Sequence, residues 1–212
     1  MPKSSYTAAD FQADVSVSRE TLERLETYAA LLEKWNRAIN LVGRTTLPDV
    51  WRRHMLDSAQ IVELLPPAPD GRPRRIVDLG SGAGFPGLVL AILGAGEVHL
   101  IESDQRKAAF LREVARHTSA PAKIHACRIE DAPEIAADVV TARALAPLTD
   151  LLGYANRFLT SGGVAVFPKG RGVEEELTAA RKAWSMQVNT LPSRSDPGGT
   201  LLLIEVSGRE TA

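Results

Sequence analysis

The chain has 212 residues, of which 44% are hydrophobic and 24% are charged, and its formal net charge at pH 7 is −1. This length suits one α/β domain with a small extension. A nearly neutral chain is not a generally basic nucleic-acid coat, although a few clustered Lys and Arg residues are enough to contact phosphates. No apolar run approaches the length of a transmembrane helix, so we expect no membrane partner.

The first 17 residues are polar and lack the charged start and apolar centre of a signal peptide. We expect this segment to be loosely ordered. The single cysteine, Cys127, excludes an intrachain disulfide and is typical of a reducing compartment. We therefore expect a cytoplasmic protein.

Two helices are expected before residue 66. The first runs from Ser18, which can cap it, to about Asn40, because apolar residues recur there at three- and four-residue steps. The second follows Pro48 and continues to about Leu65. A proline-rich run over residues 66–71 then breaks the chain. We therefore expect a helical extension over residues 1–65 and a main domain over residues 72–212.

The main domain begins with an apolar strand that runs into a glycine-rich turn. Residues 76–79 predict the strand, Gly80, Gly82 and Gly84 leave room for a ligand in the turn, and an apolar helix follows Pro86. Such a unit presents backbone N–H groups and a helix N-terminus to a ligand. We therefore expect this turn to hold a nucleotide-like cofactor.

Beyond this turn, strand and helix patterns alternate along the chain. Further strands are expected at residues 98–101, 122–126, 138–142 and 163–167, and helices after Asp104 and at residues 147–159 and 173–183. Two last strands, 186–191 and 200–206, follow each other without a helix and should pair as a hairpin. We expect a Rossmann-like α/β fold, with a seven-stranded, mostly parallel sheet, helices on both faces and an antiparallel terminal hairpin.

The glycine turn alone leaves two kinds of cofactor open. Residues 82–87 match the G-x-G-x-x-G pattern of dinucleotide-binding proteins, and Glu102 follows Gly82 by twenty residues. A nicotinamide-dependent oxidoreductase is therefore one interpretation. Asp78 argues against it, because a carboxylate inside the turn would repel a pyrophosphate but would accept hydrogen bonds from an ammonium group. Phe85 also stands at the mouth of the helix, where a pyrophosphate needs close approach.

These features favour S-adenosyl-L-methionine, which has an ammonium group, no phosphate and a ribose with two hydroxyls. Glu102, at the end of the second strand, can accept hydrogen bonds from both hydroxyls. Glu130 and Asp131 follow the third strand and can hold the adenine amino group, but an ordinary surface position explains them equally well. The residues thus predict a methyl-donating cofactor rather than a dinucleotide.

Five stretches together resemble a known family. They are residues 40–43 (NLVG), 53–58 (RHMLDS), 77–87 (VDLGSGAGFPG), 141–148 (TARALAPL) and 168–170 (PKG). In this order they resemble the small-subunit rRNA methyltransferase G family, once called the glucose-inhibited division protein B family, over roughly residues 20–206. The glycine core alone would indicate only the methyltransferase class.

The resemblance implies a class I methyltransferase fold with an N-terminal helical extension. It implies transfer of a methyl group from S-adenosyl-L-methionine to N7 of a guanine in 16S rRNA, at rRNA position 527 in the 530 loop, in or near the small ribosomal subunit. Its cofactor contacts map onto Gly80, Phe85, Ile129, Glu130 and Arg143. The reasoning from residue types adds Asp78, Gly82 and Glu102.

Basic residues at the carboxyl ends of strands are candidates for contacting RNA. Arg143 ends the fourth strand and can hold a phosphate, a guanine edge or the carboxylate of the cofactor. Lys169 ends the fifth strand beside Arg171 and suggests a phosphate contact. Arg53 and His54 in the extension are further candidates, and a structural role is equally open for His54.

N7 of guanine carries an in-plane lone pair and no proton, so its attack on the sulfonium methyl needs no general base. Catalysis should then consist of positioning the two reactants, and we expect neither an acid–base residue nor a metal. Two other classes stay open: a methyltransferase for a small molecule or protein, and a non-catalytic cofactor-binding factor of division or ribosome assembly. Converging basic clusters would favour the rRNA enzyme, whereas a small-molecule enzyme should carry an apolar lid.

Overall fold

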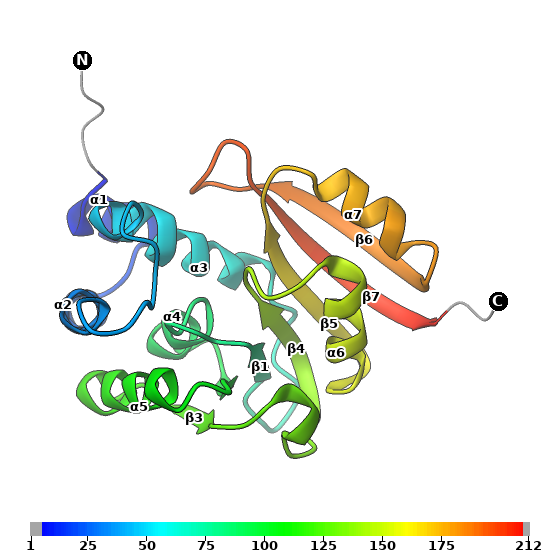
Figure 1. Ribbon diagram of the computed structural model, residues 1–212, viewed down its shortest axis with the longest axis horizontal. Coiled ribbons are helices and arrows are strands. Elements are labelled where there is room, and N and C mark those ends of the chain that lie inside the picture. Colours follow the sequence, from blue (N-terminus) through cyan, green and yellow to red (C-terminus); the bar gives the residue numbers. More distant parts are fainter. Residues whose placement is uncertain (1–5, 210–212) are drawn as a thin grey trace.

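The computed structural model describes residues 6–209. Its centre is a seven-stranded sheet of order β3-β2-β1-β4-β5-β7-β6, with helices on both faces (Figure 1). The first five strands in this order are parallel, and β7 runs antiparallel to both β5 and β6. The predicted α/β architecture with a terminal hairpin is confirmed. Within residues 6–209 no helix is long and apolar enough to cross a membrane.

The strands and helices of the main domain lie close to their predicted positions. The strands are β1 (Arg75–Leu79), β2 (Glu97–Ile101), β3 (Ala122–His125), β4 (Ala137–Ala142), β5 (Leu159–Lys169), β6 (Trp184–Pro192) and β7 (Thr200–Arg209). The helices are α4 (Gly87–Ile92), α5 (Gln105–Thr118), α6 (Leu148–Asn156) and α7 (Val173–Ala180). As predicted, Asp104 caps α5, because its carboxylate accepts hydrogen bonds from two backbone N–H groups of the first turn.

The central strand β1 is covered on both faces. Ile76 is fully buried in the core that contains α4 and α5, and its neighbour Val77 is fully buried in the core that contains α6 and α7. Successive side chains of a strand point to opposite faces. A nearly continuous apolar strand is therefore what a doubly covered parallel sheet requires, and it places the following glycine turn at the carboxyl edge of the sheet.

The N-terminal segment is more ordered than we expected. Helix α1 (Ala8–Val15) begins after Thr7, whose hydroxyl accepts a hydrogen bond from the backbone N–H of Asp10, while the Asp10 carboxylate accepts one from the backbone N–H of Thr7. This reciprocal capping box fixes the helix start, and Phe11 is fully buried. The expectation of a loose N-terminus is wrong for residues 8–15, and residues 1–5 lie outside the described residues.

Helix α2 (Arg19–Asn36) starts as predicted but ends earlier. Ser18 caps it by accepting a hydrogen bond from Thr21 N. The predicted end at Asn40 is wrong, because the side-chain oxygen of Asn36 accepts hydrogen bonds from the backbone N–H groups of Leu41 and Val42 and turns the chain back. A side chain that offers the backbone such an alternative to the helix ladder is a common way to end a helix.

The second predicted helix is a series of short, irregular helical segments. A 3-10 turn (Leu47–Asp49), a π-helical stretch (Trp51–Leu56), α3 (Asp57–Ala59) and a further 3-10 turn (Gln60–Leu64) follow one another. Widened helical turns of this kind often lie at functional sites. This stretch carries Arg53 and His54, two of the predicted RNA contacts.

The extension and the main domain share one hydrophobic core. Leu25, Tyr28 and Leu32 of α2 are fully buried in the cluster that also contains residues of α4 and α5. Arg24 donates hydrogen bonds to carbonyls at the ends of these two helices, including Thr118 O at 2.6 Å. The boundary at residues 66–71 stays a prediction about domain organisation, since packing continues across it.

Candidate functional site

The turn between β1 and α4 requires its glycines. Gly80 and Gly84 have φ angles of +59° and +93°, which residues with a Cβ rarely adopt. A Cβ on Gly80 would lie 2.6 Å from Cδ1 of Leu145, and one on Gly84 would lie 2.5 Å from Cδ1 of Leu88. The turn is therefore closely packed, and its conformation depends on residues without a side chain.

Glu102 ties the end of β2 to this turn. Its Oε2 accepts a hydrogen bond from the backbone N–H of Gly82 at 2.7 Å, and its Oε1 accepts one from Asp104 N at 2.8 Å. The side chain is nearly buried. Each carboxylate oxygen has a second lone pair, so the predicted contact with a ribose stays a prediction that these bonds do not preclude.

The expectation that the carboxylate of Asp78 lies inside the turn is wrong. The residue belongs to β1 and is fully buried, and its Oδ1 accepts a hydrogen bond from the Thr141 hydroxyl at 2.8 Å. Its Oδ2 is buried without a hydrogen-bond partner and faces the start of α4 at Gly87. Burial raises the pKa of Asp78 to about 6, against the opposing effect of the Thr141 hydrogen bond. Contact with a cofactor stays a prediction, and in this position the core encloses the carboxylate.

A small cavity of about 150 Å³ opens beside Gly80. It is lined by Gly80, Ile101, Ser103, Cys127, Arg128, Ile129, Glu130, Leu145, Ala146 and Tyr154. The structure thus brings together three of the predicted cofactor residues, Gly80, Ile129 and Glu130. Arg157 holds the turn that presents the last two, because it donates hydrogen bonds to the carbonyls of Ile129 and Ala132. Tyr154 was not predicted, since nothing in the sequence of α6 distinguishes it from a packing residue.

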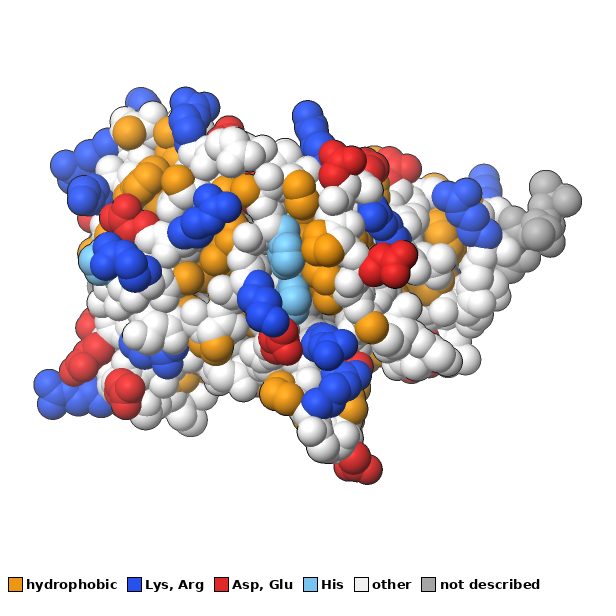
Figure 2. Space-filling view, turned by 90° about the horizontal axis from the view of Figure 1, so that it is seen from below, with side chains coloured by type: hydrophobic (Ala, Val, Ile, Leu, Met, Phe, Trp, Pro, Cys, Tyr) orange, Lys and Arg blue, Asp and Glu red, His pale blue; other side chains and the backbone are white. Residues whose placement is uncertain are grey.

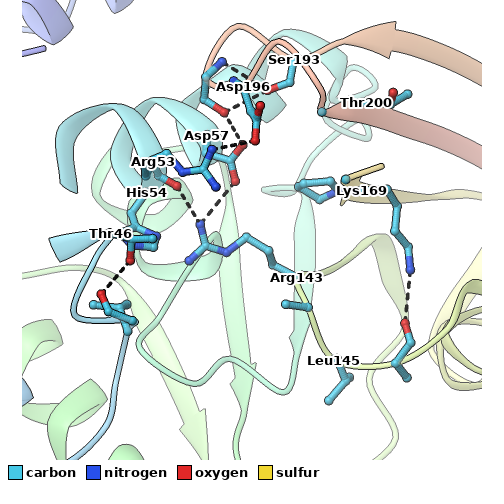
Figure 3. Close-up of a pocket in the computed structure, with 18 of the residues that line it drawn as sticks. Thr46, Arg53, His54, Asp57, Arg143, Leu145, Lys169, Ser193, Asp196 and Thr200 are labelled. Carbon is cyan, nitrogen blue, oxygen red and sulfur yellow. Dashed lines mark hydrogen bonds and ion pairs between the residues drawn. The ribbon is translucent and has the colours of Figure 1, made fainter. Parts of the chain in front are cut away.

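A larger cleft of about 830 Å³ adjoins this cavity. Its walls come from the extension, the loop after β4, the end of β5 and the loop between β6 and β7 (Figure 3). Leu145 and Ala146 line both spaces. A ligand in the small cavity and a second ligand in the cleft would therefore meet at these two residues.

Arg143 reaches across the cleft toward the extension (Figure 3). Its Nη1 lies 3.3 Å from Oδ2 of Asp57 and donates to the carbonyl of Arg53 at 3.3 Å. The guanidinium carbon lies 4.9 Å from the centre of the Phe85 ring, which also stacks with the rings of Tyr28 and His54. Phe85 is 3% exposed and lines neither space. In this arrangement Phe85 packs against Arg143, and its predicted cofactor contact stays a prediction.

His54 lines the cleft as a neutral ring. It is 7% exposed, its Nε2 lies 3.0 Å from the hydroxyl of Thr46, and its ring centre lies 4.9 Å from that of Phe85. Burial, together with the charges of Arg143 and Arg53, lowers the pKa of His54 to about 3. The imidazole therefore carries no charge near neutral pH, and any contact with RNA would be that of an uncharged group.

Every cation that lines the cleft has a carboxylate partner. Arg53 pairs with Asp196 at 2.6 Å, Arg143 with Asp57, and Lys169 with Glu176 at 2.7 Å. Lys169 also donates to the carbonyl of Ala146. Arg171 does not line the cleft but lies beside Gly198, at the edge of the β6–β7 loop. The predicted basic residues do converge, but resident acids balance their charge.

A second polar cluster lies on β2 and β3, at one edge of the sheet. Nδ1 of His99 and Nε2 of His125 lie 3.0 Å apart, and Glu97 is hydrogen-bonded to His99 and paired with Lys123. Figure 2 shows two histidine side chains against each other in the middle of one face, among charges of both signs. None of these four residues lines the cleft or the small cavity. Over residues 6–209, no group of three or more His, Cys, Asp or Glu residues is arranged to hold a metal ion.

Solved structures share the fold of this chain at low sequence identity. A ribosomal protein L11 methylase from Lactobacillus delbrueckii subsp. bulgaricus aligns with a TM-score of 0.54 and 18% identity, over 70% of this chain and 78% of that chain. A methyltransferase from Geobacter sulfurreducens aligns with a TM-score of 0.55 and 16% identity, over 87% and 89%. These likenesses show the class I methyltransferase fold.

Sequence relatives are much closer. A protein of Rhodospirillum centenum named ribosomal RNA small subunit methyltransferase G is 62% identical over 210 residues, which cover 99% of this chain and 95% of the relative. A protein of the same name from Rhodospirillum rubrum is 58% identical over 199 residues, which cover 93% and 96%. Residues 21–196 match the family described as rRNA small subunit methyltransferase G. The chain therefore belongs to the rRNA small subunit methyltransferase G family.

Proposed function

We propose that this chain transfers a methyl group from S-adenosyl-L-methionine to N7 of a guanine in 16S rRNA, at rRNA position 527 in the 530 loop. As a member of its family the chain is an rRNA small-subunit methyltransferase. The choice of N7 is our inference. It comes from the resemblance to the family, and the structural observation that supports it is the pairing of every acid in the cleft with a cation.

The small cavity is the proposed seat of the adenosine part of the cofactor. Ile129, Glu130 and Tyr154 surround it, and Gly80 opens it toward the glycine turn. Glu102 is placed at the end of β2, where a carboxylate can take the ribose hydroxyls. We assign Asp78 an indirect role, because it is enclosed in β1 and shapes the start of α4. Gly82 takes part through its backbone N–H, which Glu102 holds.

The cleft suits an acceptor atom that carries no proton. Its carboxylates, Asp57, Glu176 and Asp196, each pair with a cation, and His54 has a pKa of about 3 with its Nε2 occupied by Thr46. The carboxylates are therefore engaged in ion pairs, and the uncharged His54 ring is a very weak base. A primary amine or hydroxyl acceptor would need to lose a proton to a base, whereas N7 of guanine attacks through its lone pair and needs only to be positioned.

Transfer would take place where the two spaces meet. Leu145 and Ala146 line both the cavity and the cleft, and Lys169 holds the carbonyl of Ala146. We propose that Arg53 and Lys169 exchange part of their pairing with resident acids for contacts with RNA, and that Arg143 contacts RNA as well. The substrate lies in or near the small ribosomal subunit, which places the protein in the cytoplasm.

One labelling experiment tests this function against the two alternatives. The protein is incubated with tritiated S-adenosyl-L-methionine and, in parallel, unmodified 16S rRNA, unmodified 30S subunits and a metabolite and protein extract. We expect label in at least one RNA sample and none in the extract. Label confined to the extract would assign a small-molecule or protein substrate. Cofactor binding without label in any sample would favour a non-catalytic factor.

A further inference from the structure

We propose that Asp57 is a positioning residue, which acts on the acceptor base through Arg143 and not by contact with either reactant. The inference rests on the proposed function, because it assigns Arg143 to the acceptor side of the cleft. It concerns the RHMLDS stretch of the extension (residues 53–58), whose acidic residue has so far been described only as an ion-pair partner of Arg143.

Asp57 joins three segments that are far apart in the sequence. Its Oδ1 accepts hydrogen bonds from the Ser195 hydroxyl at 2.6 Å and from Nε2 of Gln60 at 3.2 Å, and its Oδ2 pairs with Nη1 of Arg143 at 3.3 Å. The side chains of Asp57 and Arg143 are only 16% and 19% exposed. At this burial the pair is screened less by water than an exposed pair, so it can hold the guanidinium in one orientation.

The guanidinium of Arg143 is held through Nη1, whereas its other two nitrogens are available to a ligand. Nη1 faces the carboxylate of Asp57 and the carbonyl of Arg53, and the guanidinium carbon lies over the ring of Phe85. Within residues 6–209, Nε and Nη2 have no hydrogen-bond acceptor. These donors belong to a side chain that lines the cleft. Arginine donors match O6 of a guanine or a phosphate oxygen, so their direction decides how the base is placed.

The link to the β6–β7 loop does not explain Asp57 by itself. Other contacts already hold this loop against the extension: Arg53 pairs with Asp196, Gln60 bonds to Ser193, and Glu63 pairs with Arg194. Loss of one contact among several should change the loop little. By contrast, Asp57 is the carboxylate that pairs with Arg143. Loss of Asp57 should therefore disturb the orientation of Arg143 more than the attachment of the loop.

A double-mutant cycle tests the inference. Asp57→Asn, Arg143→Gln and the double variant are compared with the unaltered chain for kcat and KM on unmodified 16S rRNA or 30S subunits, and for cofactor affinity by calorimetry. We expect Asp57→Asn to lower kcat/KM for RNA by about 10- to 100-fold, the usual range for one hydrogen bond to a charged group. We expect unchanged cofactor affinity. In the Arg143→Gln background, Asp57→Asn should have little further effect.

Two control variants separate positioning from fastening. Ser195→Ala removes the loop contact of Asp57 but leaves the pair with Arg143, and Glu63→Gln removes the negative charge from an outer ion pair of the same loop. Both should stay close to the unaltered activity. If Ser195→Ala reproduces the loss seen in Asp57→Asn, or if the effects of Asp57→Asn and Arg143→Gln are additive, the inference is wrong.

Folding is checked by circular dichroism and thermal unfolding of each variant. Should Asp57→Asn not fold, the cycle is run with Asp57→Glu, which keeps the charge but moves it by one methylene, and the same non-additivity is expected. Absence of label in RNA with the unaltered chain would refute the proposed function and this inference with it. Label with an additive cycle would refute the inference alone.

Discussion

Replacement of Asp78 by Asn should make the stability of this chain less sensitive to pH between about 4 and 6. The carboxylate is fully buried in β1, and burial raises its pKa from 3.8 to about 6. Between these two values the folded chain binds a proton that the unfolded chain has released, so the free energy of unfolding falls as pH rises and is then constant above about pH 6. Two pKa units correspond to about 3 kcal/mol, on the order of a third of a typical domain's stability.

The assay is urea unfolding at pH 4, 5, 6, 7 and 8, followed by tryptophan fluorescence. Asn keeps an acceptor for the Thr141 hydroxyl but cannot ionise, so the variant should gain stability relative to the unaltered chain as pH rises from 5 to 8. The variant must be compared with the unaltered chain at each pH, because His54 has an effect of opposite sign in both proteins. Its pKa is lowered by folding, so the free energy of unfolding falls as pH drops below 6.5, where the unfolded chain binds a proton that the folded chain does not.

Asp70→Asn, in the exposed loop before β1, is the matched control and should show no such pH-dependent difference. If the stability difference between Asp78→Asn and the unaltered chain is the same at pH 5 and pH 8, Asp78 does not carry the raised pKa on which the reasoning rests. The assignment of Asp78 to the interior would then have to be abandoned.

Three further predictions concern the two ligands. Gly80→Ala should weaken cofactor binding in calorimetry, because φ is +59° and the new Cβ would meet Leu145; Leu145→Ala in the same chain should restore part of the affinity, and no restoration would place the fault elsewhere. Glu102→Ala should weaken cofactor binding and leave RNA affinity unchanged, and the opposite pattern would remove it from the cofactor site. Lys169→Ala should weaken RNA binding and reduce its salt dependence by about one unit of slope, because one phosphate contact is lost. The unpaired carboxylate of Glu176 at the cleft should weaken RNA binding further. Lost cofactor affinity with intact RNA binding would contradict this division of roles.

Local chemistry explains the parts of the fold that could be predicted from sequence. Ser18 and Asp104 were identifiable as helix caps from their types and positions, and each accepts the expected backbone hydrogen bonds. The glycine turn was equally legible, because only glycine suits its φ angles. Helix α1 was missed although Thr7 and Asp10 stand at capping-box spacing, since an acid shorter than Glu is a weaker form of that pattern.

The candidate site was only partly predictable, because its geometry depends on distant partners. Arg53 and Asp196 form an ion pair across 143 residues of chain, and no spacing rule connects them. The basic residues were visible in the sequence, whereas the acids that balance them were not. Asp78 shows the same limit: its position two residues before Gly80 suggested a place in the turn, but the strand continues to Leu79 and carries the carboxylate into the core.

The central claim is that the chain methylates one guanine of 16S rRNA at N7. The most direct measurement is mass spectrometry of unmodified 16S rRNA after incubation with the protein and S-adenosyl-L-methionine, with digestion to nucleosides and then mapping of the modified fragment. The account predicts one 7-methylguanosine per rRNA, in the 530-loop fragment, and none when the guanine at rRNA position 527 is replaced by adenine. A methyl group on another atom or in another fragment, or no methylated nucleoside, would contradict it.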